Sequence, residues 1–277
     1  MKKILAIILT VLLLCLPVFA HENGGLLGDV PATTDDIKID GVKDAVYEQG
    51  LKIEIKSQMD SNKVHATGVA YLLYKDGYLY VFGEVTDDDI VETPESYLTG
   101  QPWISDSMEV FINEKNSGEV NDTIQYRIDN SGWPCAYSQG GLQAYGDDAA
   151  AEYFQSGVKL TETGYNTEYR IPVKENTIGI SFQINDMFSD GTAQTYAMVY
   201  SEATKKGPGS WNAEKYPYVT IGGSTVSASA TTPAASEPAD TTPAQDNTTA
   251  PATADIASLA ACAALLALAG VVLSKKR

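Results

Sequence analysis

The chain has 277 residues, of which 19 are Lys or Arg and 36 are Asp or Glu, so its formal net charge is −17. A surface this acidic lacks the basic footprint that binding to nucleic acid or to anionic lipid requires, which excludes both classes of partner. Neutral polymers and cations such as Ca²⁺ remain compatible with this charge, although most of the carboxylates are expected to serve solubility alone.

Residues 1–20 have the features of a secretory signal peptide. Two lysines precede an apolar run, and small or apolar residues occupy the cleavage positions, so the exported protein is expected to begin at His21. A membrane anchor is the alternative interpretation, but Pro17 ends the apolar run early. No internal disulfide is expected, since Cys135 is the single cysteine between the two apolar ends of the chain. Export without disulfides favours a prokaryotic cell surface.

The first part of the exported chain changes from a polar lead to strand-like patterns. Residues 21–34 are interpreted as the lead. Residues 37–41 alternate between apolar and polar and end in an Asp-Gly turn, and residues 42–47 have the spacing of one helical turn. Residues 51–56 alternate again, which predicts a further strand.

A hairpin is the clearest local signal. Two hydrophobic runs, residues 66–74 and 78–85, flank Asp76-Gly77, a dipeptide that favours a two-residue hairpin turn. Residues 136–151 are rich in Gly and Ala and are interpreted as a loop. The remaining predicted strands cover residues 107–113, 124–129, 157–160, 165–173, 177–185, 195–201 and 216–221. Many short strands with regular turn signals predict an all-β antiparallel β-sandwich, of jelly-roll or immunoglobulin-like type, over residues 35–222.

The C-terminal part has a different character. Residues 223–255 are dominated by Ser, Thr, Ala and Pro, so they cannot bury enough apolar surface to offset the entropy of ordering and are expected to form an extended stalk. Residues 256–273 are uncharged and would span about 27 Å as a helix, close to the thickness of a hydrocarbon core. Residues 274–277 contain three cations, which are expected to stay in the cytoplasm. The sequence therefore predicts one transmembrane anchor that holds the sandwich on the extracellular face of the membrane.

Strand parity brings a set of polar side chains onto one face of the predicted sandwich. In residues 107–113 the apolar side carries Met108, Val110 and Ile112, and Glu109 lies on the other side. The corresponding polar sides of the strands at 124–129 and 177–185 carry Arg127 and Gln183. If these strands share a sheet, an acid, a guanidinium and an amide converge on one face and can pair with hydroxyl groups. A solvated outer face is the alternative.

The three tryptophans fall near Gly, Pro or Ser, at the ends of predicted strands. Trp103 follows Pro102, and Trp211 follows a Gly-Pro-Gly-Ser stretch. Tryptophan in such a place is either a stacking platform or a core residue, and both interpretations stay open for Trp103, Trp133 and Trp211.

Motifs for catalysis are absent from the sequence, whereas one acidic run is suited to a metal. The chain contains two histidines, His21 and His65, and no nucleophile or zinc-protease motif, so nucleophilic catalysis has little support. A glycosidase acid pair is not excluded, because 36 acids form many pairs. Residues 87–89 with Glu92 offer the hard oxygen ligands that Ca²⁺ prefers, although a polar turn explains them equally well.

Four blocks in order resemble a family 9 carbohydrate-binding module, a β-sandwich related to the DOMON superfamily. The first is Ile39-Asp40-Gly41 with Asp44 and Tyr47, where the family has Trp in the last position. The second is the hairpin over residues 72–87, and the third, PWISDSMEVFI over residues 102–112, is the most specific. The fourth combines residues 181–186 with Ser210-Trp211. The blocks together span about residues 35–221.

The resemblance implies sugar binding without catalysis. Family members hold a terminal sugar between two Trp rings, which match Trp103 and Trp211, and their polar partners match Glu109, Arg127 and Gln183. Members also hold structural Ca²⁺, and Asp87 occupies a matching place after the hairpin. One departure is Pro208, which stands where the family has a binding Asn.

The resulting hypothesis is a cell-surface, membrane-tethered protein that binds oligo- or polysaccharide and is not an enzyme. One alternative is a structural or adhesion protein that has lost sugar binding, as the departures at Pro208 and Tyr47 allow. Another is electron transfer, because DOMON relatives can bind haem. Its axial ligands would be His65 with Met108 or Met198.

Overall fold

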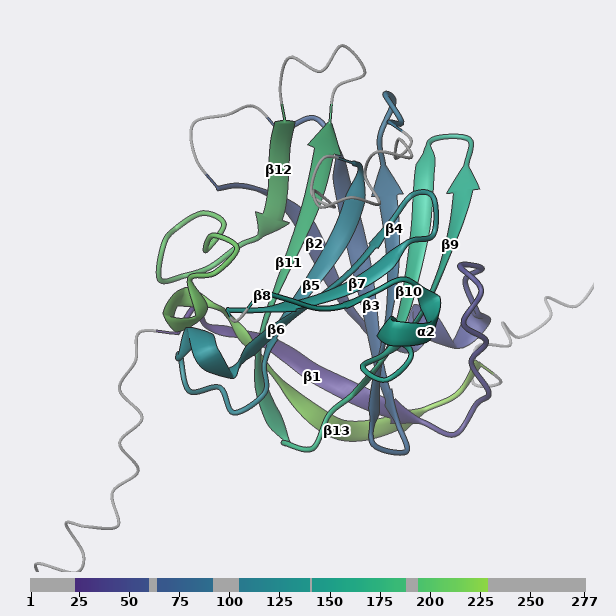
Figure 1. Ribbon diagram of the computed structural model, residues 1–277. Coiled ribbons are helices and arrows are strands. Elements are labelled where there is room, and N and C mark those ends of the chain that lie inside the picture. Colours follow the sequence, from purple (N-terminus) through teal and green to yellow (C-terminus); the bar gives the residue numbers. More distant parts are fainter. Residues whose placement is uncertain (1–22, 60–63, 92–104, 140, 188–193, 229–277) are drawn as a thin grey trace, which may run out of the picture. The chain divides into compact units, whose positions relative to one another are not determined.

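The computed structural model describes residues 23–59, 64–91, 105–139, 141–187 and 194–228 (Figure 1). These residues belong to one compact unit of the chain, Met1–Thr232. The predicted signal peptide, nearly all of the predicted stalk, the predicted transmembrane helix and Trp103 lie outside the described residues. Within the described part, no helix has both the length and the apolar character needed to span a membrane.

The described part is built almost entirely from strands. In chain order they are β1 (Leu26–Thr33), β2 (Leu51–Gln58), β3 (Thr67–Lys75), β4 (Tyr78–Thr86), β5 (Ser107–Asn113), β6 (Thr123–Asp129), β7 (Pro134–Ser138), β8 (Gly141–Tyr145), β9 (Gln155–Thr161), β10 (Gly164–Pro172), β11 (Thr177–Met187), β12 (Gln194–Val199) and β13 (Tyr218–Val226). The described helical segments are short: η1 (Ala45–Gln49), η3 (Val120–Asp122), α2 (Asp147–Ala150) and η4 (Ala213–Lys215).

The strands form two layers that are linked along two sides. One layer has the order β8-β7-β6-β5-β11-β12, and the other has the order β2-β3-β4-β10-β9, with β12 paired to β2 between them. On the other side β13 pairs with β11, β1 pairs with β13, and β1 touches β3. Figure 1 shows β1 and β13 running alongside each other across the lower part of the fold. This arrangement confirms the predicted all-β sandwich.

One core fills the space between the layers. Met108 of β5 contacts the opposite layer, since its sulfur accepts a hydrogen bond from the Thr167 hydroxyl of β10 at 3.2 Å. Along β4, Leu79, Val81 and Val85 face this main core, whereas Tyr80 and Phe82 face a second cluster on the outer side. The period-2 alternation of a strand thus supplies both clusters. Tyr47 of η1 covers the second cluster, with its ring centroid 5.3 Å from that of Phe82.

The hairpin between β3 and β4 has the turn that the sequence predicts. Asp76 and Gly77 have φ values of 51° and 86°, the left-handed pair that a type I′ turn requires. At the start of β10, Gly164 has φ of 147°, and a Cβ there would lie 2.1 Å from the carbonyl oxygen of Val85. The two hairpins β3-β4 and β9-β10 can therefore pair closely through β4 and β10.

Residues 37–41 are not the strand that their alternation predicts. Ile37 and Ile39 do pack against the second cluster, but the backbone N–H groups of Asp40 and Gly41 donate to Glu168 Oε2 at 3.0 and 3.1 Å. A buried side-chain carboxylate replaces the neighbouring strand as the hydrogen-bond partner. The apolar-polar alternation of residues 37–41 therefore comes from the packing of Ile37 and Ile39, and not from pairing with another strand.

Three further predictions from the sequence were wrong. Residues 136–151 are not a loop, because β7 and β8 pair there at the edge of the layer and α2 follows. The polar lead, residues 21–34, contains β1, whose two register shifts against β13 disrupt the period-2 pattern that would have revealed it. The pairing of β1 with β13 is parallel, whereas a purely antiparallel sandwich was expected. These strands come from opposite ends of the fold, so no hairpin fixes their direction.

Candidate functional site

The cross-strand register places the three polar residues selected by parity in one row. Glu109 of β5 lies opposite Arg127 of β6 on one side and opposite Gln183 of β11 on the other. Asn185, two residues further along β11, lies on the same face. The convergence that parity predicts is therefore present in the structure.

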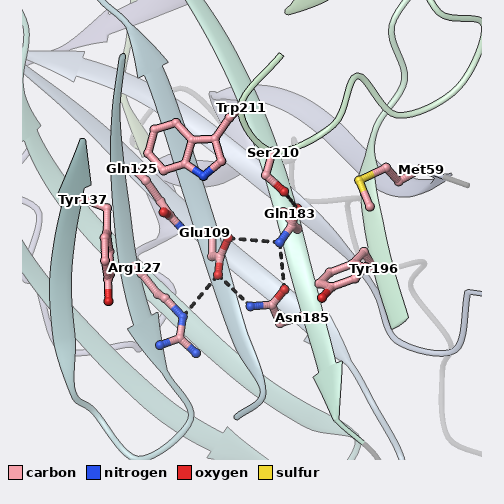
Figure 2. Close-up of a pocket in the computed structure, with 10 residues that line it drawn as sticks. All are labelled: Met59, Glu109, Gln125, Arg127, Tyr137, Gln183, Asn185, Tyr196, Ser210 and Trp211. Carbon is pink, nitrogen blue, oxygen red and sulfur yellow. Dashed lines mark hydrogen bonds and ion pairs between the residues drawn. The ribbon is translucent and has the colours of Figure 1, made fainter. Parts of the chain in front are cut away.

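These side chains form a closed hydrogen-bond network around Glu109 (Figure 2). Glu109 Oε1 lies 3.2 Å from Arg127 Nε and accepts from Asn185 Nδ2 at 2.6 Å. Glu109 Oε2 accepts from Gln183 Nε2 at 3.1 Å. Gln183 Nε2 also donates to Asn185 Oδ1 at 2.7 Å. The network fixes the orientation of both amides, because each amide nitrogen is identified by the carboxylate that it meets.

The ion pair at the centre is buried, with Glu109 and Arg127 side chains 2% and 1% exposed. Burial raises the pKa of Glu109, while the charge of Arg127 and the amide donors act in the opposite direction. Two serines also hold Arg127, because the same Nε donates to the Ser107 hydroxyl at 2.9 Å and Nη2 donates to the Ser105 hydroxyl at 3.0 Å. Glu109, Arg127, Gln183 and Asn185 together form the floor of the site. The floor therefore carries one negative and one positive charge, paired with each other in a fixed geometry.

A pocket of about 380 Å³ opens over this floor. Its volume lies within the range of small-molecule sites. The lining residues are Met59, Glu109, Gln125, Arg127, Tyr137, Gln183, Asn185, Tyr196, Ser210 and Trp211. Figure 2 shows Tyr137 and Tyr196 on opposite sides of the floor and the Trp211 indole above its upper end.

Trp211 is positioned by a ring contact of its own and by two hydrogen bonds of its neighbour Ser210. Its ring meets Phe111 edge-on, with centroids 5.5 Å apart and planes at 89°. The neighbouring Ser210 hydroxyl donates to Gln183 Oε1 at 2.5 Å, and the Tyr216 hydroxyl donates to the Ser210 carbonyl oxygen. Phe111 is an apolar residue on the otherwise polar side of β5. It lies there because it packs against Trp211.

The sequence identified part of this site. Glu109, Arg127, Gln183 and Trp211 all line the pocket, whereas Trp103 lies outside the described residues. Gln125 and Asn185 also line the pocket and lie two residues from Arg127 and Gln183, on the same polar sides, but nothing in the sequence singled them out. Tyr137 was missed because its strand was interpreted as a loop. Trp133 is 38% exposed and does not line the pocket.

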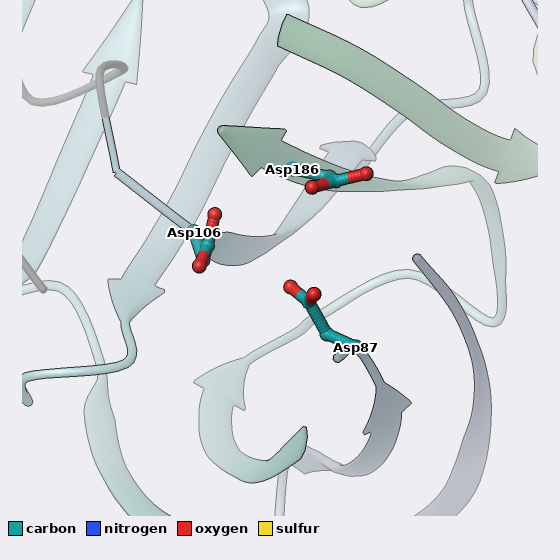
Figure 3. A group of neighbouring side chains, drawn as sticks. All are labelled: Asp87, Asp106 and Asp186. Atoms are coloured by element: carbon teal, nitrogen blue, oxygen red, sulfur yellow. The ribbon is translucent and has the colours of Figure 1, made fainter. Parts of the chain in front are cut away.

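A second group of side chains brings three carboxylates together (Figure 3). Asp87 follows β4, Asp106 precedes β5 and Asp186 lies in β11, and ligand oxygens from all three fall within 4.8 Å of one another. All three residues are buried. Burial raises the pKa of Asp106 to about 7 and also raises the pKa of Asp87. Three acids crowded in this way repel one another unless a cation or protons compensate them.

The donor set fits a hard cation. Asp87 Oδ2 is buried and has no hydrogen-bond partner among the described residues, while Oδ1 accepts from the Asp89 N–H at 3.0 Å. The sequence also singled out Asp87, but it sought the other ligands in the run at residues 87–89. Asp88 is exposed, and the carboxylates that join Asp87 come from the residue before β5 and from β11. The three side chains offer only carboxylate oxygens, which are a ligand type that Ca²⁺ and Mg²⁺ prefer.

The residues considered as haem ligands do not converge on one face. Met108 and Met198 are both buried, but Met108 faces the main core whereas Met198 lies opposite Gln183 on the pocket face. His65 is exposed at the beginning of β3.

Comparison with known proteins identifies a family for most of the fold. Residues 39–220 match the model of the carbohydrate family 9 binding domain-like family, which is more than half of the chain. Endo-1,4-beta-xylanase A of Thermotoga neapolitana is 32% identical over 160 residues, 55% of this chain and 14% of the xylanase. Exoglucanase XynX of Acetivibrio thermocellus is 32% identical over 137 residues, 46% of this chain and 11% of the exoglucanase. The chain thus matches a small part of these enzymes.

Solved structures with the same fold support this match. A family 9 carbohydrate-binding module from Caldicellulosiruptor kristjanssonii, in complex with cellotriose, superposes with a TM-score of 0.53 at 20% identity. The match covers 74% of this chain and 98% of that module. A complex of such a module with glucose gives a TM-score of 0.51 at 20% identity, covering 72% and 96% of the two chains.

Proposed function

The chain belongs to the carbohydrate family 9 binding-domain family, and on this premise we propose that it binds a saccharide, without cleaving it, in the pocket over Glu109. The observation that carries the proposal is the pairing of an aromatic ring, Trp211, with a charge-neutral floor of acid, guanidinium and amides. One face of a pyranose ring presents C–H groups that pack on an aromatic face. Its hydroxyls, which are both donors and acceptors, suit amides and carboxylates.

The family resemblance assigns the second stacking ring to Trp103. With two rings, stacking contributes on the order of 1 kcal/mol per ring, and each net hydrogen bond adds about 0.5–1.5 kcal/mol. After the cost of immobilising the ligand, micromolar to millimolar dissociation constants are expected. The related proteins are a xylanase, an exoglucanase and modules solved with cellotriose and glucose, so cello- and xylo-oligosaccharides are the first ligands to test.

Binding without cleavage is supported by the chemistry of the lining. Glycoside hydrolysis uses two carboxyl groups on opposite sides of the scissile bond. Among the lining residues that the structure describes, Glu109 is the single carboxylate, and Arg127 and two amides already hold its oxygens. A carboxylate held in this way is a fixed acceptor rather than a mobile acid.

Isothermal titration with cello- and xylo-oligosaccharides tests the proposal. The wild-type chain should bind at least one series, Trp211→Ala and Trp103→Ala should each weaken binding by tenfold or more, and no reducing sugar should be released on incubation. Trp133→Ala is the matched control, because Trp133 is exposed away from the pocket. No heat of binding with any saccharide in the presence of Ca²⁺ would contradict the proposal and favour the structural or adhesion alternative.

We also propose that Asp87, Asp106 and Asp186 hold a structural Ca²⁺. The support is the buried oxygen set and the absence of a described hydrogen-bond partner for Asp87 Oδ2. When bound, the cation would neutralise the acids and join the end of β4 to β5 and β11. Binding of the ion would then fix the end of β4, the start of β5 and the Asp186 end of β11 relative to one another, next to the sugar site.

A further proposal concerns location. The uncharged run at residues 256–273, followed by three cations, supports a membrane tether, and the Ser/Thr/Pro/Ala-rich residues 223–255 support a stalk. The sugar-binding domain would then stand on the extracellular face of a prokaryotic membrane, where several copies could bind one polysaccharide with added avidity.

A further inference from the structure

The carboxylate cluster and the sugar pocket meet on the same two strands. At the start of β5, the carboxylate residue Asp106 lies between Ser105 and Ser107, and in β11 the carboxylate residue Asp186 follows Asn185. Ser107 and Asn185 lie directly opposite each other in the pairing of β5 with β11. Since successive side chains of a strand point to opposite faces, each carboxylate that faces the cluster has a neighbour that faces the floor of the pocket.

The two neighbours of Asp106 hold the guanidinium of the floor. Ser107 Oγ accepts from Arg127 Nε at 2.9 Å. Ser105 accepts from Arg127 Nη2 at 3.0 Å through its hydroxyl and at 3.3 Å through its carbonyl oxygen. Both serines are fully buried, and Arg127 Nε in turn lies 3.2 Å from Glu109 Oε1. The position of the ion pair in the floor therefore depends on the residues that flank Asp106.

Asn185 makes a similar connection from β11. Its Nδ2 donates to Glu109 Oε1 at 2.6 Å and to Ser107 Oγ at 3.3 Å. On the other side of the strand, the Met187 N–H donates to Asp106 Oδ1 at 2.8 Å. The ends of β5 and β11 that carry the carboxylates are therefore joined to each other and to the floor of the pocket.

Like charges oppose the closure of this junction. Figure 3 shows the Asp87 carboxylate directed at the space between Asp106 and Asp186, and its Oδ2 is buried without a hydrogen-bond partner among the described residues. Three buried carboxylates repel one another, and separating Asp106 from Asp186 would displace the ends of β5 and β11 that hold the floor. A divalent cation held by the three side chains removes this repulsion.

We infer that cation binding and sugar binding are coupled, so that Ca²⁺ held by Asp87, Asp106 and Asp186 raises the affinity of the pocket for its sugar. This inference rests on the proposed function, because it assigns a regulator to the same pocket. Ser105 and Ser107 are the positioning residues that transmit the effect, since they hold the ion pair of the floor. Thermodynamic linkage requires that the sugar raise the affinity for Ca²⁺ by the same factor.

The test is titration calorimetry of the full chain, solubilised in a detergent without a sugar headgroup. Cellobiose and xylobiose are titrated in saturating Ca²⁺ and in EDTA, and Ca²⁺ is titrated with and without saturating sugar. EDTA should raise the dissociation constant of the sugar by about five- to fiftyfold, and the sugar should lower that of Ca²⁺ by the same factor. All titrations are run below the unfolding transition in EDTA, which circular dichroism locates.

Two variants and two controls locate the coupling. Asp87→Asn removes a ligand that does not line the pocket, and it should abolish the response of sugar affinity to Ca²⁺. The double variant Ser105→Ala/Ser107→Ala keeps every carboxylate, so Ca²⁺ should still raise its Tm while the response of sugar affinity to Ca²⁺ largely disappears. Ser181→Ala removes a buried hydroxyl of β11 that has no hydrogen-bond partner among the described residues, and Asp76→Asn changes an exposed acid. Both controls should keep the wild-type coupling.

The possible results separate the coupling from the proposed function. Equal sugar affinities in Ca²⁺ and in EDTA, for a wild-type chain that binds both ligands, would overturn the coupling and leave sugar binding intact. Undiminished coupling in the double serine variant would overturn the route through Ser105 and Ser107. A wild-type chain that binds sugar but no Ca²⁺ would overturn the coupling together with the cation site. Failure to bind any saccharide in either condition would overturn the proposed function and the coupling with it.

Discussion

At the scale of single residues, the floor of the pocket depends on the buried pair of Glu109 and Arg127. Both side chains are almost entirely removed from solvent, and the amides of Gln183 and Asn185 and the hydroxyl of Ser107 complete their hydrogen bonds. A buried pair of this kind contributes little net stability compared with an apolar pair, but the loss of one partner leaves the other charge buried without compensation.

Arg127→Ala should therefore destabilise the protein strongly. At pH 7 the free energy of unfolding is expected to fall by about 3–5 kcal/mol, because the Glu109 carboxylate loses its counter-charge inside the sheet. Urea denaturation measures this loss. The matched control is Lys115→Ala, which breaks an ion pair with Asp122 whose lysine is largely exposed and should cost about 0–1 kcal/mol. Equal losses for the two variants would contradict the central role of the buried pair.

The sequence could predict the polar part of the site but not its aromatic walls. Parity put Glu109, Arg127 and Gln183 each on the polar side of its own strand, because side chains alternate along any strand, and the pairing of β6, β5 and β11 then brings them together. Tyr137 and Tyr196 meet this face only through strand order, which joins β7 and β12 to the same layer. The period of a single strand does not show which distant strands it pairs with. The two tyrosines could therefore be assigned to this face only from the structure.

At the scale of elements, one buried carboxylate joins an irregular segment to the sheet. Glu168 of β10 accepts hydrogen bonds from the N–H groups of Asp40 and Gly41 and from the Tyr47 hydroxyl of η1 at 2.9 Å. Burial raises the pKa of Glu168 to about 7, although these three donors act in the opposite direction. The segment that precedes β2 is therefore fixed by an acid that titrates near neutral pH.

This pKa gives the stability a defined pH dependence. Between about pH 4.5 and 7, the folded protein keeps a proton on Glu168 that the unfolded chain releases, so the free energy of unfolding falls as the pH rises through this window. The contribution of Glu168 to this fall is on the order of 1–3 kcal/mol and levels off above pH 7. Urea denaturation at pH 5, 6, 7 and 8, in EDTA, should show a smaller fall for Glu168→Gln than for the wild type.

The control for this experiment is Glu162→Gln, which removes an exposed glutamate from the turn between β9 and β10. It should keep the wild-type pH dependence. If Glu168→Gln and Glu162→Gln gave the same slope, the assigned role of Glu168 would be wrong.

Calcium should stabilise the junction of β4, β5 and β11. If Asp87, Asp106 and Asp186 hold the ion, saturation to 100 times its dissociation constant adds about 2.7 kcal/mol, which corresponds to a rise in Tm of roughly 5–10 °C. Thermal unfolding with Ca²⁺ and with EDTA measures this shift. Asp87→Asn should abolish the difference. Asp76→Asn should preserve it, because Asp76 is exposed in the β3-β4 turn and Asn tolerates its left-handed conformation. A Ca²⁺ effect that survives in Asp87→Asn would place the ion elsewhere.

Elements with strong local signals were predicted well, and those defined by distant partners were not. The β3-β4 hairpin followed from its Asp-Gly turn, since the conformation of two residues sets the register of both strands. By contrast, β1 has two register shifts, and the short β7 and β8 come from a Gly- and Ala-rich stretch. Their strand character comes from the partners that they pair with, which sequence periodicity does not reveal.

At the scale of the whole molecule, charge and chain order suit a domain that faces neutral polysaccharide. The five basic residues at the two ends leave 14 Lys and Arg against 36 Asp and Glu, a formal charge of about −22 for the intervening chain. This charge repels anionic lipid headgroups and polyanions, so a neutral glycan is the partner that meets no electrostatic barrier.

The proposed tether gives a prediction for the full chain. Expressed as the full chain in a bacterial host, the protein should sediment with the membrane fraction and resist extraction by high salt. Deletion of residues 256–277 should release it into the medium or periplasm, because the uncharged run would no longer anchor it. Deletion of residues 274–277 alone keeps the apolar run and is the control. Membrane association of both deletion variants would contradict the tether.

An NMR titration of residues 21–228 with cellobiose and xylobiose tests most directly whether the pocket over Glu109 binds sugar. Sugar binding in the pocket over Glu109 predicts that the side-chain amide signals of Gln183 and Asn185 and the indole N–H signal of Trp211 shift together with ligand concentration. The signals of the matched exposed residues Trp133 and Tyr200 should stay in place. Shifts confined to another surface, or no shift with any saccharide, would contradict the proposal that this face binds sugar.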